Sequence, residues 1–369
     1  MAWMSLGCDS RQVHFKQMKI LYGVCGEGLG HSSRAKTIIP YLESRGHEVK
    51  IIAYGQAIPV LKKEGFEVFK IRGATLKYKK GRLKKRETIK ASLKNLFFNI
   101  KKSRQICNLM KEKFDLCISD FEFTTAILSS LYSLPLISLD NQHRTANLEL
   151  EIPKKYQKVF FYAYLITKIV ASKADFYIIT SFAKGKIKEK YKQNTFIVPP
   201  VIRPEIKILK PKKENFVLVY LTKKDARIFK ILKQIPEKFI VYGFKDKGKD
   251  KNIIYKKTGS YFIKDLSRCK AVIATAGFTL ISEALYLKKP YLAFPLNNQF
   301  EQLTNALFLK QVGFGDYSDK PEKSKIENFL KNLEEYRKKM KNYKPDYNLL
   351  FKTLDKVLRR IKKEIIKFP

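Results

Sequence analysis

The chain has 369 residues, of which 75 are Lys or Arg and 34 are Asp or Glu, so its formal net charge is +41. With 45% hydrophobic and 13% aromatic residues it can bury the cores of two ordinary domains, which excludes wholesale disorder. No stretch approaches the roughly 18 uncharged apolar residues of a membrane-spanning helix, and the 5 cysteines contain no Cys-x-x-Cys pair, which argues against a disulfide framework or a structural zinc site and favours a cytoplasmic location.

The positive charge has three competing explanations: a nucleic acid partner, an anionic membrane surface, or a lysine-rich surface that serves solubility. The basic residues are mostly lysine and are spread over nearly the whole chain. Proteins that read nucleic acids favour arginine, which makes bidentate contacts. The total charge alone therefore does not identify a partner.

Residues 1–17 show no hydrophobic periodicity, and we expect them to be a disordered extension. They lack the apolar segment of a secretory signal. From Met18 on, short β-branched or aromatic runs alternate with amphipathic stretches. We expect strands at 19–24, 48–53, 66–71, 114–119, 135–139 and 175–179. Helices between successive strands predict right-handed crossovers and a parallel sheet.

A second series of strands follows the Pro-rich segment Val198-Pro199-Pro200-Val201-Ile202, which is typical of a linker. Its strands are expected at 216–221, 238–242, 252–255, 271–274 and 290–294. The expected domains are an N-terminal Rossmann-like domain over 18–198, a linker over 199–210, a C-terminal Rossmann-like domain over 211–343 and a helical segment over 344–369. The predicted fold class is α/β, with two doubly wound domains facing each other across a ligand cleft.

The first motif, Gly26-Glu27-Gly28-Leu29-Gly30-His31, joins the first expected strand to the first helix. Glycines permit a tight turn close to a ligand, and the following helix N-terminus attracts anions. The spacing differs from the G-x-G-x-x-G of dinucleotide sites, and no acidic residue ends the second strand. We expect His31 to face a substrate, although a simple helix cap would have the same pattern.

The second motif, Thr275-Ala276-Gly277-Phe278-Thr279, follows a buried strand and begins a helix that carries Glu283. The free N–H groups of such a turn suit an anion, and a carboxylate one turn later can accept hydrogen bonds from ribose hydroxyls. Glu301, Gln302 and Asn305 follow the next strand, and their polar groups suit the recognition of sugar hydroxyls. Either segment alone would be equally consistent with a capped helix and solvated side chains.

Together, these motifs resemble those of glycosyltransferases with the GT-B fold, and in particular the MurG-like enzymes of family 28, over residues 18–315. The resemblance implies that Glu283 holds the ribose, and that Phe262 and Ile263 lie in a loop that packs on a uracil base. Glu301 stands where the family has Gln. The nucleotide-sugar site implied by the resemblance comprises Phe262, Ile263, Thr275, Ala276, Gly277, Phe278, Thr279, Glu283, Glu301, Gln302 and Asn305.

The resemblance implies an inverting, metal-independent transfer of a sugar, expected to be an N-acetylhexosamine, from a UDP-sugar to a lipid-linked or cell-surface glycan. No Asp-x-Asp motif is present, and we expect neither a metal nor another cofactor. The acceptor hydroxyl needs a general base. We favour His31, with Asp120 second, although a helix cap explains Asp120 or Asp140 equally well. Further candidates on the acceptor side are Gly28, Gly30, Glu122, Asp140 and His143.

Residues 77–90 carry eight basic side chains and one acidic one, and they precede an amphipathic stretch that ends at 102. Leu93, Leu96, Phe97 and Ile100 share one helical face there. This pattern is typical of docking on an anionic membrane, and the apolar run 159–170 would add a second contact. Ordinary core helices would also account for both segments. On the first interpretation the protein is peripheral to the inner face of the cell membrane.

Two other function classes compete with the glycosyltransferase. A UDP-sugar epimerase of the same fold would share the nucleotide site, and Asp120 with Glu122 would supply its acid and base. A non-catalytic nucleic-acid-binding protein is the third class, but no signature of one is present and a glycan-type cleft would then have no purpose. We therefore expect a nucleotide-sugar donor and a glycan acceptor as partners, and no nucleic acid.

Overall fold

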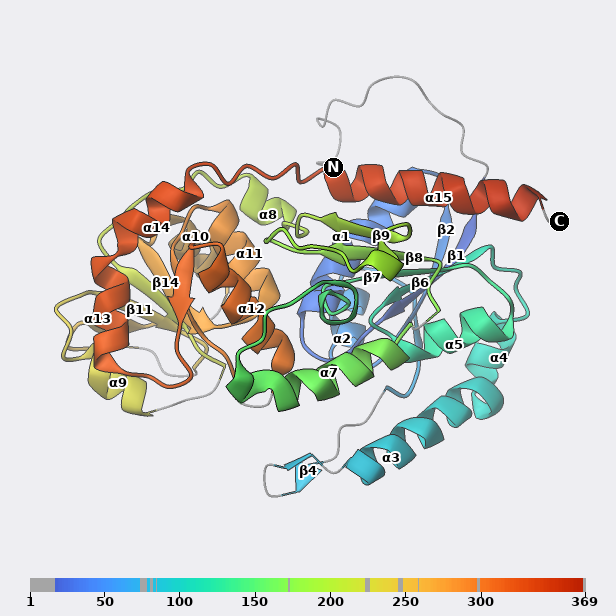
Figure 1. Ribbon diagram of the computed structural model, residues 1–369, viewed down its shortest axis with the longest axis horizontal. Helices are drawn as coiled ribbons and strands as arrows, with labels where there is room; N and C mark the ends of the chain where they lie inside the picture. Colours follow the sequence, from blue (N-terminus) through green and yellow to red (C-terminus); the bar gives the residue numbers. More distant parts are fainter. Residues whose placement is uncertain are drawn as a thin grey trace.

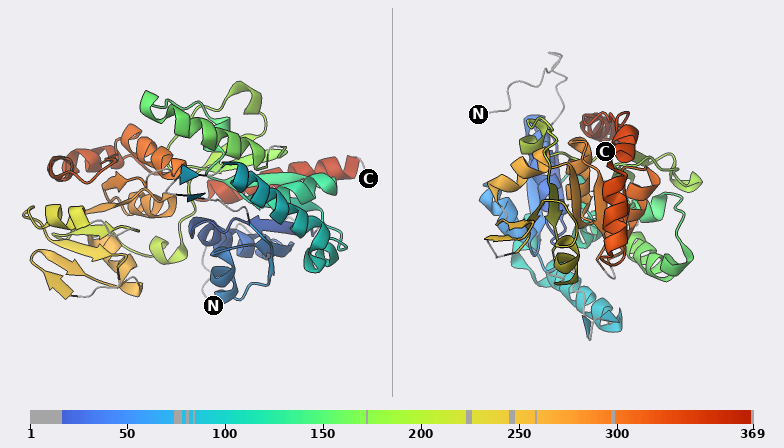
Figure 2. Two further views of the ribbon diagram at one scale, coloured as in Figure 1. Left: turned by 90° about the horizontal axis from the view of Figure 1, so that it is seen from below. Right: turned by 90° about the vertical axis from the view of Figure 1, so that its left-hand side faces the viewer.

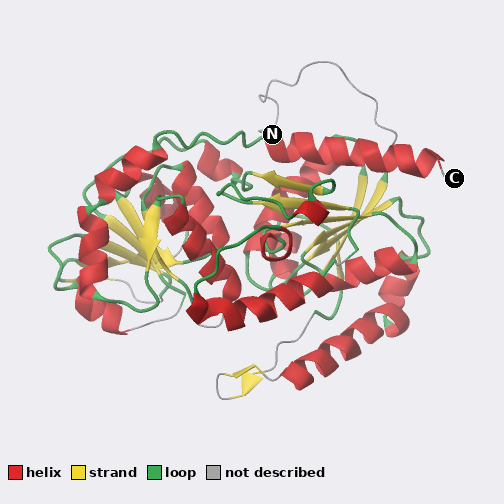
Figure 3. Cartoon of the chain, viewed as in Figure 1, coloured by secondary structure: helices red, strands yellow, loops and turns green. Residues whose placement is uncertain are grey.

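The computed structural model describes residues 17–73, 78–79, 82–83, 85–171, 173–222, 226–244, 248–257, 259–296 and 299–367. It contains two α/β domains side by side, each built on one seven-stranded sheet with helices on both faces (Figures 1 and 3). The predicted fold class is therefore confirmed. The expected extension over 1–17 lies outside the described residues, apart from Gln17, and so do residues 77, 80, 81 and 84 of the basic run.

The first sheet has the order β3-β2-β1-β6-β7-β8-β9, and all neighbouring strands are parallel. Its central strands are buried along their whole length, because helices cover both faces of a parallel sheet. The strands are β1 (Lys19–Val24), β2 (Glu48–Ala53), β3 (Val68–Lys70), β6 (Leu116–Asp120), β7 (Leu136–Asp140), β8 (Phe176–Thr180) and β9 (Thr195–Val198).

The helices around this sheet are α1 (Gly30–Ser44), α2 (Ala57–Lys63), α3 (Lys85–Phe97), α4 (Arg104–Leu109), α5 (Phe123–Leu131), α6 (Arg144–Asn147) and α7 (Gln157–Ile169). A π-helical turn, Phe98–Lys102, continues α3, and 3-10 turns lie at Lys154–Tyr156 and Glu189–Tyr191. A small hairpin of β4 (Tyr78–Lys79) and β5 (Arg82–Leu83) precedes α3.

The second sheet has the order β12-β13-β11-β10-β14-β15-β16, and only the β12–β13 pair is antiparallel among its described strands. The strands are β10 (Val217–Tyr220), β11 (Phe239–Tyr242), β12 (Gly248–Asp250), β13 (Ile253–Tyr255), β14 (Ala271–Thr275), β15 (Tyr291–Phe294) and β16 (Gly315–Tyr317). The associated helices are α8 (Pro204–Lys207), α9 (Ala226–Leu232), α10 (Ser260–Arg268), α11 (Phe278–Tyr286), α12 (Phe300–Gln311), α13 (Lys323–Lys331) and α14 (Leu333–Met340).

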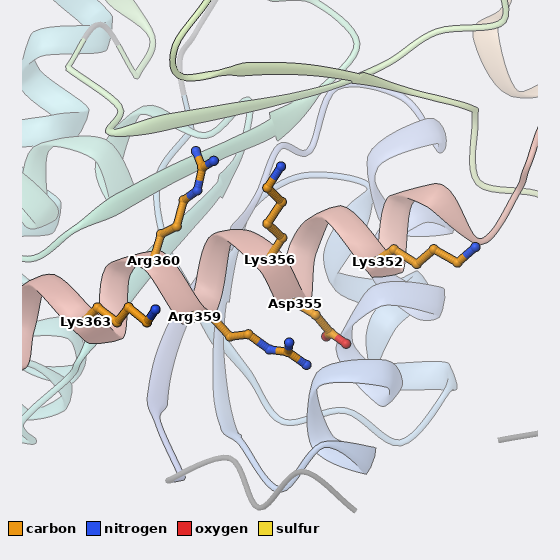
Figure 4. A pocket seen from close by; sticks show the side chains of 6 residues that line it. All are labelled: Lys352, Asp355, Lys356, Arg359, Arg360 and Lys363. Carbon is orange, nitrogen blue, oxygen red and sulfur yellow. The ribbon is translucent and has the colours of Figure 1, made fainter. Parts of the chain in front are cut away.

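The last helix, α15 (Leu349–Lys367), returns from the second domain and lies over the first (Figure 1). Its apolar side chains, including Leu350, Leu354 and Ile361, join the core formed by β1, β6 and β8. Figure 4 shows its outer side, where a hollow is lined by Lys352, Asp355, Lys356, Arg359, Arg360 and Lys363. These are charged side chains of a single helix, and they lack the mixture of apolar walls and converging polar groups that defines a substrate site.

None of the helices in the described part of the chain combines the length and apolar character needed to cross a membrane.

Candidate active site

Three neighbouring strands bring the predicted catalytic residues to one edge of the first sheet. Asp120 is the last residue of β6, Asp140 is the last residue of β7, and His31 lies in the first turn of α1, directly after the loop that follows β1. The strand order reverses between β1 and β6. Sheets of this kind bind ligands outside the carboxyl ends of their strands at such a reversal.

His31, Arg34 and Asp120 form one buried cluster at this point. His31 Nδ1 lies 2.7 Å from Asp120 Oδ1, while Arg34 donates from Nε to Asp120 Oδ2 at 2.9 Å and from Nη2 to Oδ1 at 2.5 Å. Only 5% of His31 and none of Asp120 is exposed. Burial opposes a charged imidazole, but the Cys25 sulfur and the Asp120 carboxylate together raise the pKa of His31 well above its ordinary value. A carboxylate that holds Nδ1 leaves Nε2 to act as a base.

Arg34 was not predicted from the sequence. Its position in the sequence could have identified it, because a residue three positions after His31 lies on the same side of α1. Arg34 makes two hydrogen bonds to Asp120 and so fixes the position of that carboxylate beside His31.

Phe121 lies over the imidazole. Its ring stacks on His31 at a centroid distance of 6.5 Å and meets the edge of His143 at 6.1 Å. Its backbone has φ +52°, a left-handed conformation that costs a bulky residue about 1 kcal/mol or more. This conformation could not be predicted from the sequence, because phenylalanine rarely adopts a positive φ.

Asp140 and His143 are a second buried pair, but both are engaged in holding the backbone. His143 Nδ1 lies 2.7 Å from Asp140 Oδ2, and its Nε2 lies 3.0 Å from the carbonyl oxygen of Val170. Asp140 also accepts from the backbone N–H of His143 at 2.8 Å. Burial opposes ionisation of Asp140, yet His143 lowers the pKa of Asp140 to about 2. Asp140 thus holds the backbone of His143, the residue before α6, and neither ring nitrogen of His143 is free.

Glu122 caps α5 instead of facing Asp120. Its carboxylate accepts from the backbone N–H groups of Thr124 and Thr125, both at 2.7 Å, and from the Thr125 hydroxyl at 2.6 Å. Burial raises the pKa of Glu122. Glu122 is thus engaged as a helix cap, and its partners differ from those of Asp120.

The motif of the second domain lies across from the first glycine-rich loop. Gly277 is the N-cap of α11, with Thr275 and Ala276 before it and Thr279 just inside the helix. A Cβ atom added to Gly30 would lie 3.3 Å from Thr279 Oγ1, so the two loops approach closely. Gly28, in the loop between β1 and α1, has φ +82°, a left-handed conformation that glycine adopts without steric cost.

Glu283, expected to hold the ribose, is paired with Arg203. The guanidinium donates from Nε to Oε1 at 2.6 Å and from Nη2 to Oε2 at 2.9 Å. Burial raises the pKa of Glu283, and Arg203 opposes this rise. Arg203 belongs to the expected linker and was not predicted as a site residue, because no nearby sequence pattern indicates that it pairs with Glu283, 80 residues away.

Glu301 and Asn305 of α12 contact the first domain. Glu301 accepts from Asn141 Nδ2 and Gln142 Nε2, both at 3.0 Å. Asn305 accepts from Arg144 Nη2 at 2.6 Å and donates to the carbonyl oxygen of Ala276 at 2.9 Å. Burial lowers the pKa of Arg144 to about 10. The Arg144 guanidinium lies 5.1 Å from the ring centroid of Phe278 and 5.1 Å from that of Phe308.

A cavity of about 160 Å³ lies between the two domains at this contact. Its walls are aromatic and polar, as is typical of sites that bind a small ligand. Its lining comprises Phe121, Asn141, Gln142, Arg144, Thr145, Ala163, Ile166, Thr167, Phe300, Glu301 and Thr304.

Three predicted donor residues have other surroundings. Phe262 and Ile263 lie in α10 and not in a loop, and the Phe262 ring is buried against Tyr220 and Tyr242. Gln302 lies in the first turn of α12 and accepts from the backbone N–H of Leu296, in the loop before the helix, at 3.1 Å. Among the described residues no three His, Cys, Asp or Glu side chains come together as metal ligands.

Comparisons with known proteins agree with this architecture. The model of a family described as glycosyl transferase family 1 matches residues 18–334. A Methanosarcina mazei protein described as an uncharacterized glycosyltransferase is 28% identical, and the match covers 83% of this chain and 87% of that protein.

Two solved glycosyltransferases share the fold. The calicheamicin glycosyltransferase CalG4 has a TM-score of 0.66 at 15% identity, covering 94% of this chain and 98% of that one. MurG of Acinetobacter baumannii has a TM-score of 0.57 at 16% identity, covering 94% and 100%. Because the family match spans most of the chain, the protein belongs to glycosyl transferase family 1 and is a glycosyltransferase with the GT-B fold.

Proposed function

We propose that this glycosyltransferase moves a sugar, taken to be an N-acetylhexosamine, from a UDP-sugar to a hydroxyl of a lipid-linked or cell-surface glycan, by analogy with the MurG-like enzymes of family 28. The transfer inverts the anomeric carbon and uses no metal. The observation that carries the proposal is the His31–Asp120 pair, which lies beside an interdomain cavity whose opposite wall contains Glu301.

His31 acts as the general base in this mechanism. Its Nε2 takes the proton of the acceptor hydroxyl, and the acceptor oxygen attacks the anomeric carbon of the donor. The bond from that carbon to the diphosphate oxygen breaks, and UDP leaves with the electron pair. Asp120 orients the imidazole and stabilises the imidazolium that forms.

The charge that develops on the leaving diphosphate is stabilised by the first turn of α11. The free N–H groups there, from Phe278 and Thr279 onward, carry the positive end of the helix dipole. Glu283 accepts hydrogen bonds from the ribose with the lone pairs that Arg203 does not use. The cavity beside Glu301 then holds a sugar ring.

Exposed apolar side chains on α3 and α7 support a membrane-bound acceptor. Figures 1 and 2 show both helices on the same side of the first domain. Phe161, Leu165 and Ile169 follow one another at helical spacing along α7, and Leu93 and Phe97 do so on α3. The exposed Lys90, Lys94, Lys101 and Lys158 flank these two rows. Apolar side chains with a lysine border are typical of a surface that docks on anionic lipid.

The cavity lies against the same helix, since Ala163, Ile166 and Thr167 of α7 form one of its walls. A lipid-linked acceptor at this surface would therefore present its sugar beside His31. We therefore propose that the protein acts at the inner face of the cell membrane, and the lysines and the apolar rows support this proposal.

The decisive experiment is mass spectrometry of the products formed from a panel of nucleotide sugars and the host's lipid fraction. We expect a glycolipid one sugar heavier than its precursor, formed with a UDP-sugar and in the presence of EDTA. Conversion of a UDP-sugar into its epimer without any acceptor would contradict the proposal, and so would transfer only to soluble acceptors.

A further inference from the structure

We infer that Gln142 is a positioning residue that covers the basic nitrogen of His31 until a ligand engages Glu301. The inference rests on the proposed role of His31 as the base. It concerns the hydrogen bonds of one amide, which join the first domain to the second.

The Gln142 side chain has three contacts. Its Nε2 lies 3.2 Å from His31 Nε2 and 3.0 Å from Glu301 Oε2, and its Oε1 accepts from the backbone N–H of Asn141 at 3.2 Å. A carboxylate accepts hydrogen bonds and donates none, so the NH₂ group must be the end that faces Glu301. The second hydrogen of this NH₂ group then points at His31.

This orientation selects one tautomer of the neutral imidazole. In that tautomer His31 Nε2 accepts a hydrogen bond from Gln142 and Nδ1 donates to Asp120 at 2.7 Å, with Arg34 Nη2 3.3 Å from Nδ1. His31 is thus held in the tautomer that a base requires, but the lone pair that would take the acceptor's proton is occupied. The site is oriented and covered at the same time.

Glu301 controls this cover from the second domain. Asn141 Nδ2 and Gln142 Nε2 both donate to its carboxylate at 3.0 Å. A donor sugar that gives its hydroxyl hydrogens to Glu301 competes with these two amides. Once Gln142 loses this anchor its amide is free to rotate, and Nε2 of His31 becomes available to the acceptor hydroxyl. The base is therefore uncovered when the donor is in place, which limits the activation of water by an empty site.

The test compares the titration of His31 by NMR in the free protein and in Gln142→Met, which keeps the shape of the side chain and removes the NH₂ group. The chain has 4 histidines, so His31→Asn identifies the signal. We expect His31 to bind its proton roughly fivefold more tightly in Gln142→Met, since a net hydrogen bond contributes a factor of this order. Gln311→Met, at the exposed end of α12, is the matched control and leaves the titration unchanged.

Glu301→Gln tests the same cover from the other domain. It removes the carboxylate that orients Gln142, but it also removes a negative charge near the imidazole, so the test is the effect of Gln142→Met in the two backgrounds. We expect Gln142→Met to tighten proton binding by His31 in the wild type and to change it little in Glu301→Gln. No effect in the wild type, or equal effects in both backgrounds, would overturn the inference. The titration does not depend on turnover, so the two claims fail separately: His31→Asn that retains full activity would overturn the proposed base while leaving the cover intact.

Discussion

The Asp120 carboxylate binds two side chains at once, and this arrangement determines the reactivity of His31. Arg34 and His31 both contact Oδ1, and Arg34 also bonds Oδ2. The carboxylate is thus held by the guanidinium while it orients the imidazole. In this arrangement Asp120 need not take up a proton itself, because the charge that His31 acquires is stabilised by the fixed negative charge beside it.

The pH dependence of turnover follows from this pair. Only a neutral imidazole accepts a proton, so kcat/KM rises with pH as His31 loses its proton. Although burial opposes the charged form, Cys25 and Asp120 raise the pKa of His31, so the acidic limb lies above about 6.5, the ordinary value. In Asp120→Asn the limb moves to lower pH and kcat falls by roughly 10²- to 10⁴-fold. A limb that stays in place in this variant would assign the base elsewhere.

His31→Ala separates catalysis from nucleotide binding. We expect kcat to fall by roughly 10²- to 10⁴-fold, because the acceptor then has no general base. The affinity for UDP, measured by calorimetry, stays unchanged, since the residues of α11 and Glu283 are untouched. His47→Ala is the control, because His47 lies at the start of β2 and contacts the backbone of Met18. Equal loss of activity in both variants would point to instability and not to catalysis.

At the scale of elements, the strands of the two sheet interiors were predictable, because their runs of buried apolar residues are bounded by turns. Of the edge strands, β3 was predicted, whereas β9, β12 and β16 were not; β12 and β16 lack a run of apolar residues. β9 ends at Val198, directly before the prolines that suggested a linker. The position of His31 was predictable from the loop after β1, whereas its link to Gln142 and Glu301 depends on how two domains meet.

The helix α7 shows what periodicity cannot decide. Its apolar run suits a core helix as well as a membrane surface, and the sequence does not show which elements cover it. In the structure Thr167 is its only fully buried residue, while Phe161 and Ile169 are 55% and 60% exposed. The exposed apolar row therefore follows from the packing around α7 and not from its composition.

Replacing Ile169 with Glu tests the role of this row. We expect the variant to bind liposomes containing anionic lipid several-fold more weakly in a flotation assay, because it loses an apolar contact and adds a repelled charge. Ile208→Glu is the matched control, since Ile208 is 82% exposed at the end of α8 and lies on neither α3 nor α7. Equal flotation of the two variants would remove α7 from membrane docking.

At the scale of the whole molecule, the positive charge is distributed over more than one surface. Lysines border the exposed rows of α3 and α7, and a separate cationic row follows the outer side of α15. Figure 1 shows α15 on the opposite side of the first domain from α3 and α7. The net charge therefore does not mark one binding face. The lysines that bear on the proposed function are those beside exposed apolar side chains.

The last helix also makes the folding of the first domain depend on the end of the chain. Leu354 of α15 is fully buried among core residues of the first domain, so Leu354→Ala should cost about 2–5 kcal/mol of stability. We expect faster hydrogen exchange in β8 and β9, against which α15 packs, with β14 in the second domain unchanged. Lys352→Ala, on the exposed side of the same helix, should change stability by less than about 0.5 kcal/mol. Faster exchange in β14 but not in β8 would show that α15 stabilises the second domain instead.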